Sequence, residues 1–174
     1  ASPDWATASD HHLTETRRLL DAYAARLSAI LDRCAPGDRG RLEFRIGELR
    51  RRARRWPEAM TSLRASAARA PDSTASARVL LEIARVHAAA GRADSALALY
   101  RRVAALTADP ALRETALWER ARELQDLGRF TEAEGAFARV VALGGRRRAE
   151  SEYLSGLMAF ACGRSGPALE RWQG

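Results

Sequence analysis

The sequence predicts an all-α protein built from stacked two-helix units, and three observations carry this prediction. The helix-forming residues Ala, Leu, Arg and Glu dominate the 174 residues, whereas aromatic residues make up only 6%. An alanine recurs at positions 59, 96, 133 and 168, which are spaced by 37, 37 and 35 residues. Glycine and proline stand mainly between the helix-like segments. A chain of this length is expected to form one domain.

The first predicted element is an amphipathic helix over residues 7–33. Leu13, Leu20 and Leu27 recur every seven residues and therefore share one helical face. Residues 34–40 contain Pro36 and two glycines, which should end this helix. We expect residues 1–39 to form an N-terminal helix and linker that needs a partner surface.

The rest of the chain repeats around the four alanines, which stand early in the second helix of each unit. Small residues on paired helices let the backbones approach closely, and a large apolar side chain one turn later fills the space beside them. The small partners stand twelve residues earlier and the large residues four residues later: Gly47, Ala84, Ala121 and Gly156 for the first set, Leu63, Tyr100, Phe137 and Trp172 for the second.

A turn separates the two helices of each unit. It reads Gly-Arg at 91–92, 128–129 and 163–164, with Arg54-Arg55 at the matching place in the first unit. Glycine there favours the left-handed conformation that closes a helix. Breakers follow the second helices, at Pro71, at 109–110 and at 144–145. The predicted hairpins are residues 40–73, 77–110, 114–147 and 149–174, the last one partial.

These features resemble the tetratricopeptide repeat family, most clearly in GRADSALALYRRVAALTADP at 91–110 and LGRFTEAEGAFARVVALGG at 127–145. The resemblance implies a right-handed α-solenoid with an extra N-terminal helix. Arg50, Arg120, Glu43 and Glu152 depart from the family pattern and leave the helix register of the first and fourth units open. A weaker resemblance is to the superhelical region of bacterial soluble lytic transglycosylases.

No constellation of residues predicts catalysis. His11 and His12 are adjacent and would point about 100° apart on a helix, which does not suit a shared metal ion. Cys34 and Cys162 have no second cysteine or histidine at metal-ligand spacing, and no disulfide framework is indicated. We therefore expect no enzyme activity, no cofactor and no metal.

The chain carries a formal net charge of +7, with 29 basic residues that are all arginine. The absence of lysine is typical of a GC-rich bacterial genome, but the positive field still favours acidic partners. Residues 41–55 alone hold seven arginines against two glutamates. Nucleic-acid binding through Arg50–Arg55 and Arg146–Arg148 is an alternative to protein binding.

The resemblance implies that exposed residues of the first helices line a concave face. We expect this groove to take an acidic, partly apolar protein segment, although the same arginines could simply be solvated charge. Leu81 and Phe160 are also assigned to this exposed face. The predicted groove residues are Arg41, Phe44, Glu48, Arg51, Arg52, Arg78, Arg85, Trp118, Arg122 and Tyr153.

These expectations describe a non-catalytic scaffold or adaptor, a subunit or arm of a larger bacterial assembly. The alternative is the N-terminal superhelical domain of a periplasmic transglycosylase without its catalytic domain. The opening Ala-Ser-Pro suits a processed end, so a periplasmic or secreted location is preferred to the cytoplasm. No stretch reaches the ~20 apolar residues that a membrane span needs, although the partner could be a membrane complex.

Overall fold

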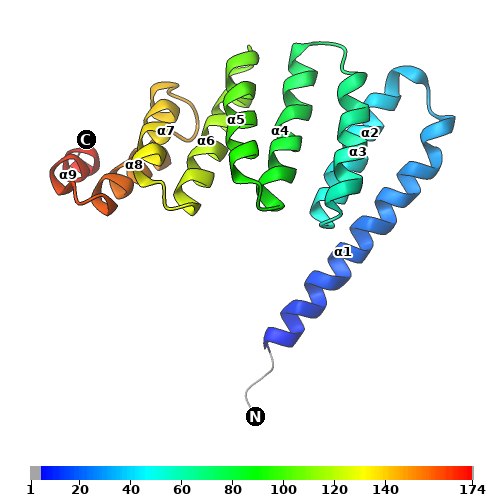
Figure 1. Cartoon of the computed structure of the whole chain (residues 1–174), viewed down its shortest axis with the longest axis horizontal. Coiled ribbons are helices and arrows are strands. Elements are labelled where there is room, and N and C mark those ends of the chain that lie inside the picture. The colour runs from blue at the N-terminus through cyan, green and yellow to red at the C-terminus, as the bar shows by residue number, and fades with distance from the viewer. Residues whose placement is uncertain (1–4, 174) are drawn as a thin grey trace. The chain divides into compact units, whose positions relative to one another are not determined.

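The computed structural model describes the backbone of residues 5–173 and the side chains of residues 12–166, 168–170 and 172. This part of the chain is helical, with no strand (Figure 1). The side chain of His11 lies outside the described residues. The helices are α1 (Trp5–Ile30), the short 3-10 helix η1 (Leu31–Arg33), α2 (Pro36–Arg52), α3 (Trp56–Ala68), α4 (Ser73–Ala89), α5 (Ala93–Leu106), α6 (Pro110–Asp126), α7 (Phe130–Ala142), α8 (Arg148–Ala161) and α9 (Ser165–Gln173).

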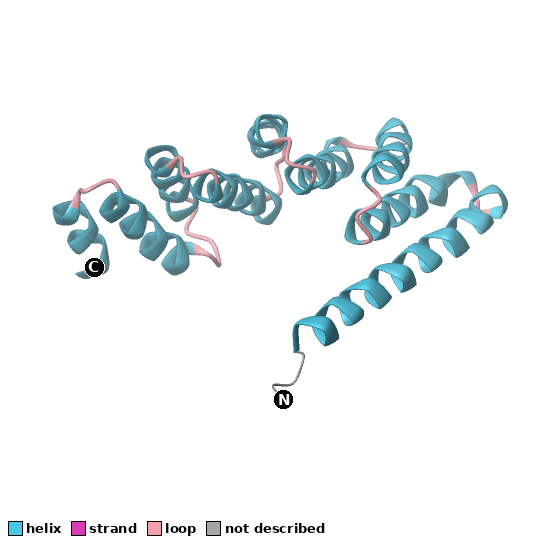
Figure 2. Ribbon diagram, turned by 60° about the horizontal axis from the view of Figure 1, so that its bottom comes forward, coloured by secondary structure: helices cyan, strands magenta, loops and turns pink. Residues whose placement is uncertain are grey.

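The helices form two compact units, which are described separately. Unit 1 is Ala1–Pro71 and unit 2 is Asp72–Gly174. In unit 1 the contacts join α1 to α2 and α2 to α3, whereas in unit 2 each helix from α4 to α9 packs against the next (Figures 1 and 2). The sequence divided the chain after residue 39. The contacts instead group α1 with the first hairpin, because Ala24 of α1 is buried with Ile46 and Leu49 of α2.

Three first helices begin four residues before the predicted start of their hairpins. The prolines read as breakers open two of them, since Pro36 and Pro110 stand at the first helical position. Proline is well suited there because the first backbone N–H of a helix has no partner within the helix. Asp72 caps α4 by accepting from the backbone N of Ala75 at 2.7 Å, and Asp109 caps α6 in the same way.

The predicted close contacts of small residues are confirmed within each hairpin. Ala59, Ala96, Ala133 and Ala168 are all fully buried. A Cβ atom built on Gly47 would stand 2.6 Å from Cγ of Leu63, the large residue expected at that contact. No side chain fits at Gly47 without displacing its neighbour, so the absence of one sets the distance between α2 and α3.

The four hairpin turns share one geometry. Gly91, Gly128 and Gly163 have positive φ angles of 73°, 72° and 75°, and Arg54 adopts the same left-handed conformation at φ 62°. The residue after each donates its backbone N–H to a carbonyl five residues earlier, which closes the first helix of the hairpin. These bonds run from Arg55 to Arg50, Arg92 to His87, Arg129 to Leu124 and Arg164 to Ala159, at 2.8, 2.9, 2.9 and 3.0 Å.

Candidate partner-binding surfaces

Five predicted groove residues lie on α2 of unit 1. Arg41 and Arg52 are exposed, and a guanidinium nitrogen of Arg41 is 3.9 Å from Asp38 on the same helix. Glu48 is half-buried and accepts a hydrogen bond from Arg45 at 3.0 Å. The two remaining residues, Phe44 and Arg51, are both half-buried. This helix therefore offers Arg41 and Arg52 to solvent, while the other three are partly covered.

Part of the arginine cluster at 50–55 is engaged inside unit 1. Arg50 donates to Ser62 Oγ of α3 at 2.8 Å and to Ser28 Oγ of α1 at 3.2 Å. One arginine in place of an apolar residue thus links three helices. Arg55 pairs with Asp21 of α1 at 3.3 Å. These contacts reduce the positive charge that the cluster could offer to a nucleic acid.

The acidic residues that depart from the family pattern also have partners. Glu43 is buried on α2 and pairs with Arg69 at 3.0 Å. Glu152 accepts from Arg148 one turn earlier on α8 at 2.9 Å. A buried carboxylate is tolerated where a cation satisfies it, so the charge at Glu43 does not disturb the first hairpin.

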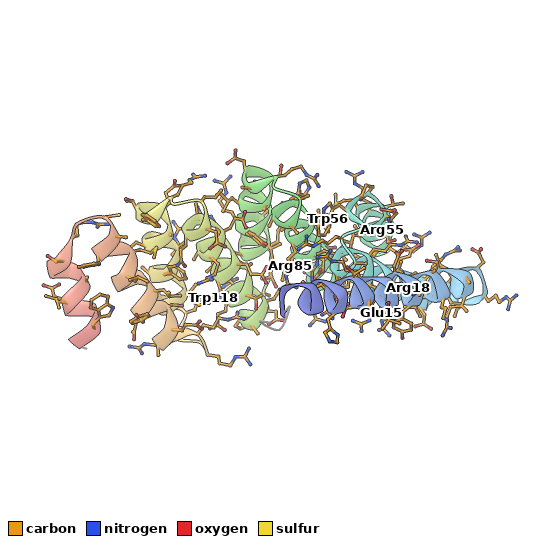
Figure 3. All side chains as sticks on the ribbon, turned by 90° about the horizontal axis from the view of Figure 1, so that it is seen from below. Glu15, Arg18, Arg55, Trp56, Arg85 and Trp118 are labelled. Carbon is orange, nitrogen blue, oxygen red and sulfur yellow. The ribbon has the colours of Figure 1, made fainter. Side chains whose placement is uncertain are left out.

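Arg85 differs from the prediction, which placed it in the groove as an exposed contact residue. Its Nε lies 2.9 and 3.0 Å from the two carboxylate oxygens of Glu119 on α6, and its other nitrogens contact Glu119 and the buried Glu82. Burial disfavours its charge, but the hydrogen bonds and attraction of Glu119 and Glu82 outweigh burial and raise the pKa of Arg85. Arg85, labelled in Figure 3, is therefore a structural link between α4 and α6.

Leu81, one turn before Arg85 on α4, also differs from the expectation. Leu81, which was expected to be exposed, is 4% exposed and packs in a core with Tyr100 and Leu112. Helix α4 contacts both α5 and α6, so a face that would be open in an isolated hairpin is covered by the next one. Burial, and then the negative charge of Glu119, raises the pKa of Tyr100 above its ordinary value.

Trp118 of α6 is held by contacts on both sides. Its ring meets the edge of Phe137 at a centroid distance of 5.5 Å, and the guanidinium carbon of Arg147 lies 5.3 Å from the ring centroid. The backbone N of Arg147 donates to Glu114 at 2.7 Å. Trp118 is half-buried, so it offers part of its ring rather than a free anchor.

The other basic groove residues of unit 2 are exposed. Arg78 on α4 lies 3.8 Å from Asp109, at the long limit of an ion pair. Arg122 on α6 donates to Gln125 at 3.3 Å. Exposed contacts of this kind contribute little to stability, so both side chains can exchange them for a partner.

An exposed aromatic surface covers the last hairpin, and we define it as Tyr153, Phe160, Leu169 and Trp172. Tyr153 and Phe160 are both 57% exposed and stand seven residues apart on α8, which places them on one helix face. The ring of Trp172 lies 6.0 Å from that of Tyr153 and 6.4 Å from that of Phe160. Leu169 stands one turn before Trp172 on α9 and is also exposed.

The position of Trp172 depends on Gly156. A Cβ atom on Gly156 would lie 2.5 Å from Nε1 of the indole, so only glycine leaves room for the ring. Trp172 Nε1 donates to the backbone oxygen of Tyr153 at 3.2 Å. The sequence identified this small and large pair but not the stacking. The result is a preorganised aromatic surface of which the sequence predicted only Tyr153 and Phe160 as contact residues.

The described residues show no cluster that could hold a metal ion. Cys34 is half-buried with its Sγ 3.1 Å from the Leu31 oxygen, and Cys162 is exposed; both are free thiols. None of the helices seen here combines the length and the apolar character that crossing a bilayer requires. The candidate functional features of the described residues are therefore exposed surfaces and buried ion pairs.

Comparisons with known proteins identify the fold. No protein-family model and no curated protein matches the chain. Several solved structures do. One is MamA, with a TM-score of 0.70 and 15% identity over 88% of this chain and 85% of that one. Another is BtubC from P. vanneervenii, with a TM-score of 0.68 and 19% identity over 89% of this chain and 71% of that one. The kinesin light chain TPR-like repeats of Podosopora anserina match with a TM-score of 0.66 and 19% identity over 93% of this chain and 92% of that one. The chain has the tetratricopeptide-like fold.

The tetratricopeptide-like fold confirms the predicted fold class, an all-α solenoid of helical hairpins. The low identities show the fold alone. The weaker resemblance to lytic transglycosylases receives no support from these structures. Repeats of this fold stack into extended surfaces.

Proposed function

We propose that this chain is a non-catalytic scaffold that binds a protein partner, as a subunit or arm of a larger bacterial assembly. The observation that carries the proposal is the aromatic surface on α8 and α9, where Tyr153 and Phe160 expose more than half of their area. Trp, Tyr and Phe dominate the energetic centres of protein interfaces, because they bury a large area with few rotatable bonds.

The geometry of the surface favours a partner over plain solvent exposure. The rings of Tyr153 and Phe160 are held against Trp172, so little side-chain entropy remains to be lost on binding. A contiguous exposed apolar area of this kind on a folded domain marks an interaction site. Binding a protein segment here would bury the aromatic surface without rearranging the hairpin.

The partner surface in unit 1 is proposed to be basic. Arg41 and Arg52 project from α2 into solvent, and an acidic segment would find charge complementarity there. Arg85 is excluded from this role because Glu82 and Glu119 engage it. Substituting Arg85 would disrupt α4 and α6, so the basic surface is better tested with Arg41→Glu and Arg52→Glu.

The test compares the proteins captured by the purified chain and by the double variant Tyr153→Ser with Phe160→Ser. We expect the double variant to lose the proteins that the wild type captures, as identified by mass spectrometry, and to keep its helical circular dichroism. Removing two interface anchors of this type weakens binding by about 2 kcal/mol or more, or roughly thirtyfold.

The matched control is Leu106→Ser, which removes an apolar side chain of similar exposure from α5, outside the aromatic surface. This variant should capture the same proteins as the wild type. Identical capture by the Tyr153 and Phe160 variant would reject the aromatic surface as the binding site. Loss of capture in both variants would show that general surface apolarity, and not this surface, is responsible.

A further inference from the structure

A cleft of about 380 Å³ lies between α5, α6 and α7, away from the surfaces described above. Three arginines line it, one from each helix: Arg101, Arg120 and Arg139. Apolar residues, among them Leu117 and Leu143, form the remaining wall. Three cations therefore surround an apolar opening.

The charges of this arginine cluster are not neutralised by the described part of the chain. None of the three arginines has an ion pair or a side-chain hydrogen bond with a described residue. The acid that acts on Arg120 is Glu132, and both of its oxygens are already engaged by Arg129, at 2.6 and 2.8 Å. Burial, followed by the positive charges of Arg139 and Arg101, lowers the pKa of Arg120. The three positive charges therefore repel one another in the folded chain.

Groups that repel one another in the free protein are stabilised when an anion binds between them. Guanidinium groups pair with carboxylates through two parallel hydrogen bonds, and an apolar wall adds contact area for a neighbouring side chain. The cleft offers no aromatic ring on which a base could stack, which disfavours a nucleic acid as the occupant.

We propose that the cleft formed by Arg101, Arg120 and Arg139 binds an acidic segment of a protein partner, with a carboxylate between the guanidinium groups and a leucine-sized residue against Leu117 and Leu143. This site does not depend on the proposed function of the aromatic surface. The side chains of Trp118 and Arg120 project about 160° apart around α6, so the cleft and the face that carries Trp118 lie on different sides of that helix.

The experiment measures binding of a fluorescent synthetic peptide of alternating glutamate and leucine by anisotropy at low salt. Arg120→Gln and Arg139→Gln should each weaken binding about tenfold or more, because each removes a charged hydrogen-bond donor. Both variants should unfold at the same temperature as the wild type or higher, since each removes a repulsive charge. A peptide with glutamine in place of glutamate should bind at least tenfold more weakly to the wild type.

Arg102→Gln is the matched control, because Arg102 is the exposed neighbour of Arg101 on α5 and does not line the cleft. It removes the same charge and should leave peptide affinity within about twofold. Equal peptide binding by Arg120→Gln and the wild type would overturn the proposal, as would equal binding of the glutamine peptide or no detectable binding. If a single-stranded oligonucleotide bound more tightly than the peptide and lost affinity in Arg120→Gln and Arg139→Gln, the occupant of the cleft would be a nucleic acid and not an acidic segment. The double variant at Tyr153 and Phe160 should bind the peptide normally, which separates this site from the aromatic surface.

Discussion

At the scale of single residues, each of the four hairpin turns contains one residue with a positive φ angle at the same place, and in the first hairpin this residue is Arg54. The other three turns use glycine, which adopts a positive φ without steric cost. Arg54 carries a Cβ atom that clashes with the backbone in this conformation. The hydrogen bond from Arg55 to Arg50 nevertheless forms, so the hairpin contacts impose a conformation that arginine itself disfavours.

Replacing Arg54 by glycine should therefore stabilise the protein. We expect the free energy of unfolding to rise by about 0.5–1 kcal/mol, the cost of a left-handed residue less the greater flexibility of glycine in the unfolded chain. Denaturant unfolding followed by circular dichroism measures this change. The reverse substitution, Gly128→Ala, should lower the free energy of unfolding by about 1 kcal/mol. A loss of stability in Arg54→Gly would mean that the arginine side chain contributes more than its backbone conformation costs.

At the scale of helices, packing is set by where side chains are absent. Gly47 permits α2 and α3 to meet at Leu63, and Gly156 leaves room for Trp172 between α8 and α9. Gly135 of α7 has no atom within 4 Å of a built Cβ and has no such role. The same residue type thus sits at a close contact in one helix and in open space in another.

The substitution of alanine for glycine should have opposite effects at these two positions. Gly47→Ala forces a methyl group against the buried Leu63 and should lower the free energy of unfolding by about 1–3 kcal/mol. Gly135→Ala replaces a weak helix former in an exposed position and should raise it by up to about 1 kcal/mol. Thermal unfolding of both variants checks the pair. A stabilised Gly47→Ala variant would contradict the contact between α2 and α3.

At the scale of the whole molecule, the absence of lysine leaves few groups that titrate in the alkaline pH range. The 29 lysine-plus-arginine residues are all arginine, so no lysine titrates near pH 10. Tyr100 is buried beside Glu119, and its pKa is raised in the folded protein. The unfolded chain therefore loses this proton first as the pH rises.

The resulting stability has a definite sign. The contribution of Tyr100 is fully present below the unfolded pKa of about 10 and is lost as the pH rises above that value. We expect the free energy of unfolding to fall between about pH 9.5 and 11.5, with a shallower fall in Tyr100→Phe. Urea unfolding at a series of pH values measures both slopes. Parallel slopes would show that Tyr100 is not the titrating group, whatever the absolute stability of the variant.

The sequence by itself determined the hairpins, their turns and the seams of small residues, because these depend on local spacing along the chain. It also identified Tyr153 and Phe160 as exposed residues of α8. It correctly placed Pro36 and Pro110 after the end of a helix but did not predict that each one opens the next helix. Proline disfavours the interior of a helix but suits its first position, and the residues alone do not say which applies.

Only the tertiary structure decided how the charges are used. Arg85 pairs with Glu119 on α6, 34 residues away, and is therefore engaged away from the predicted groove, whereas Arg101, Arg120 and Arg139 line one cleft without an ion pair to a described acid. Helical spacing predicts neighbours three or four residues apart on one helix. Partners on different helices depend on how the hairpins stack, and that arrangement exists only in the folded chain.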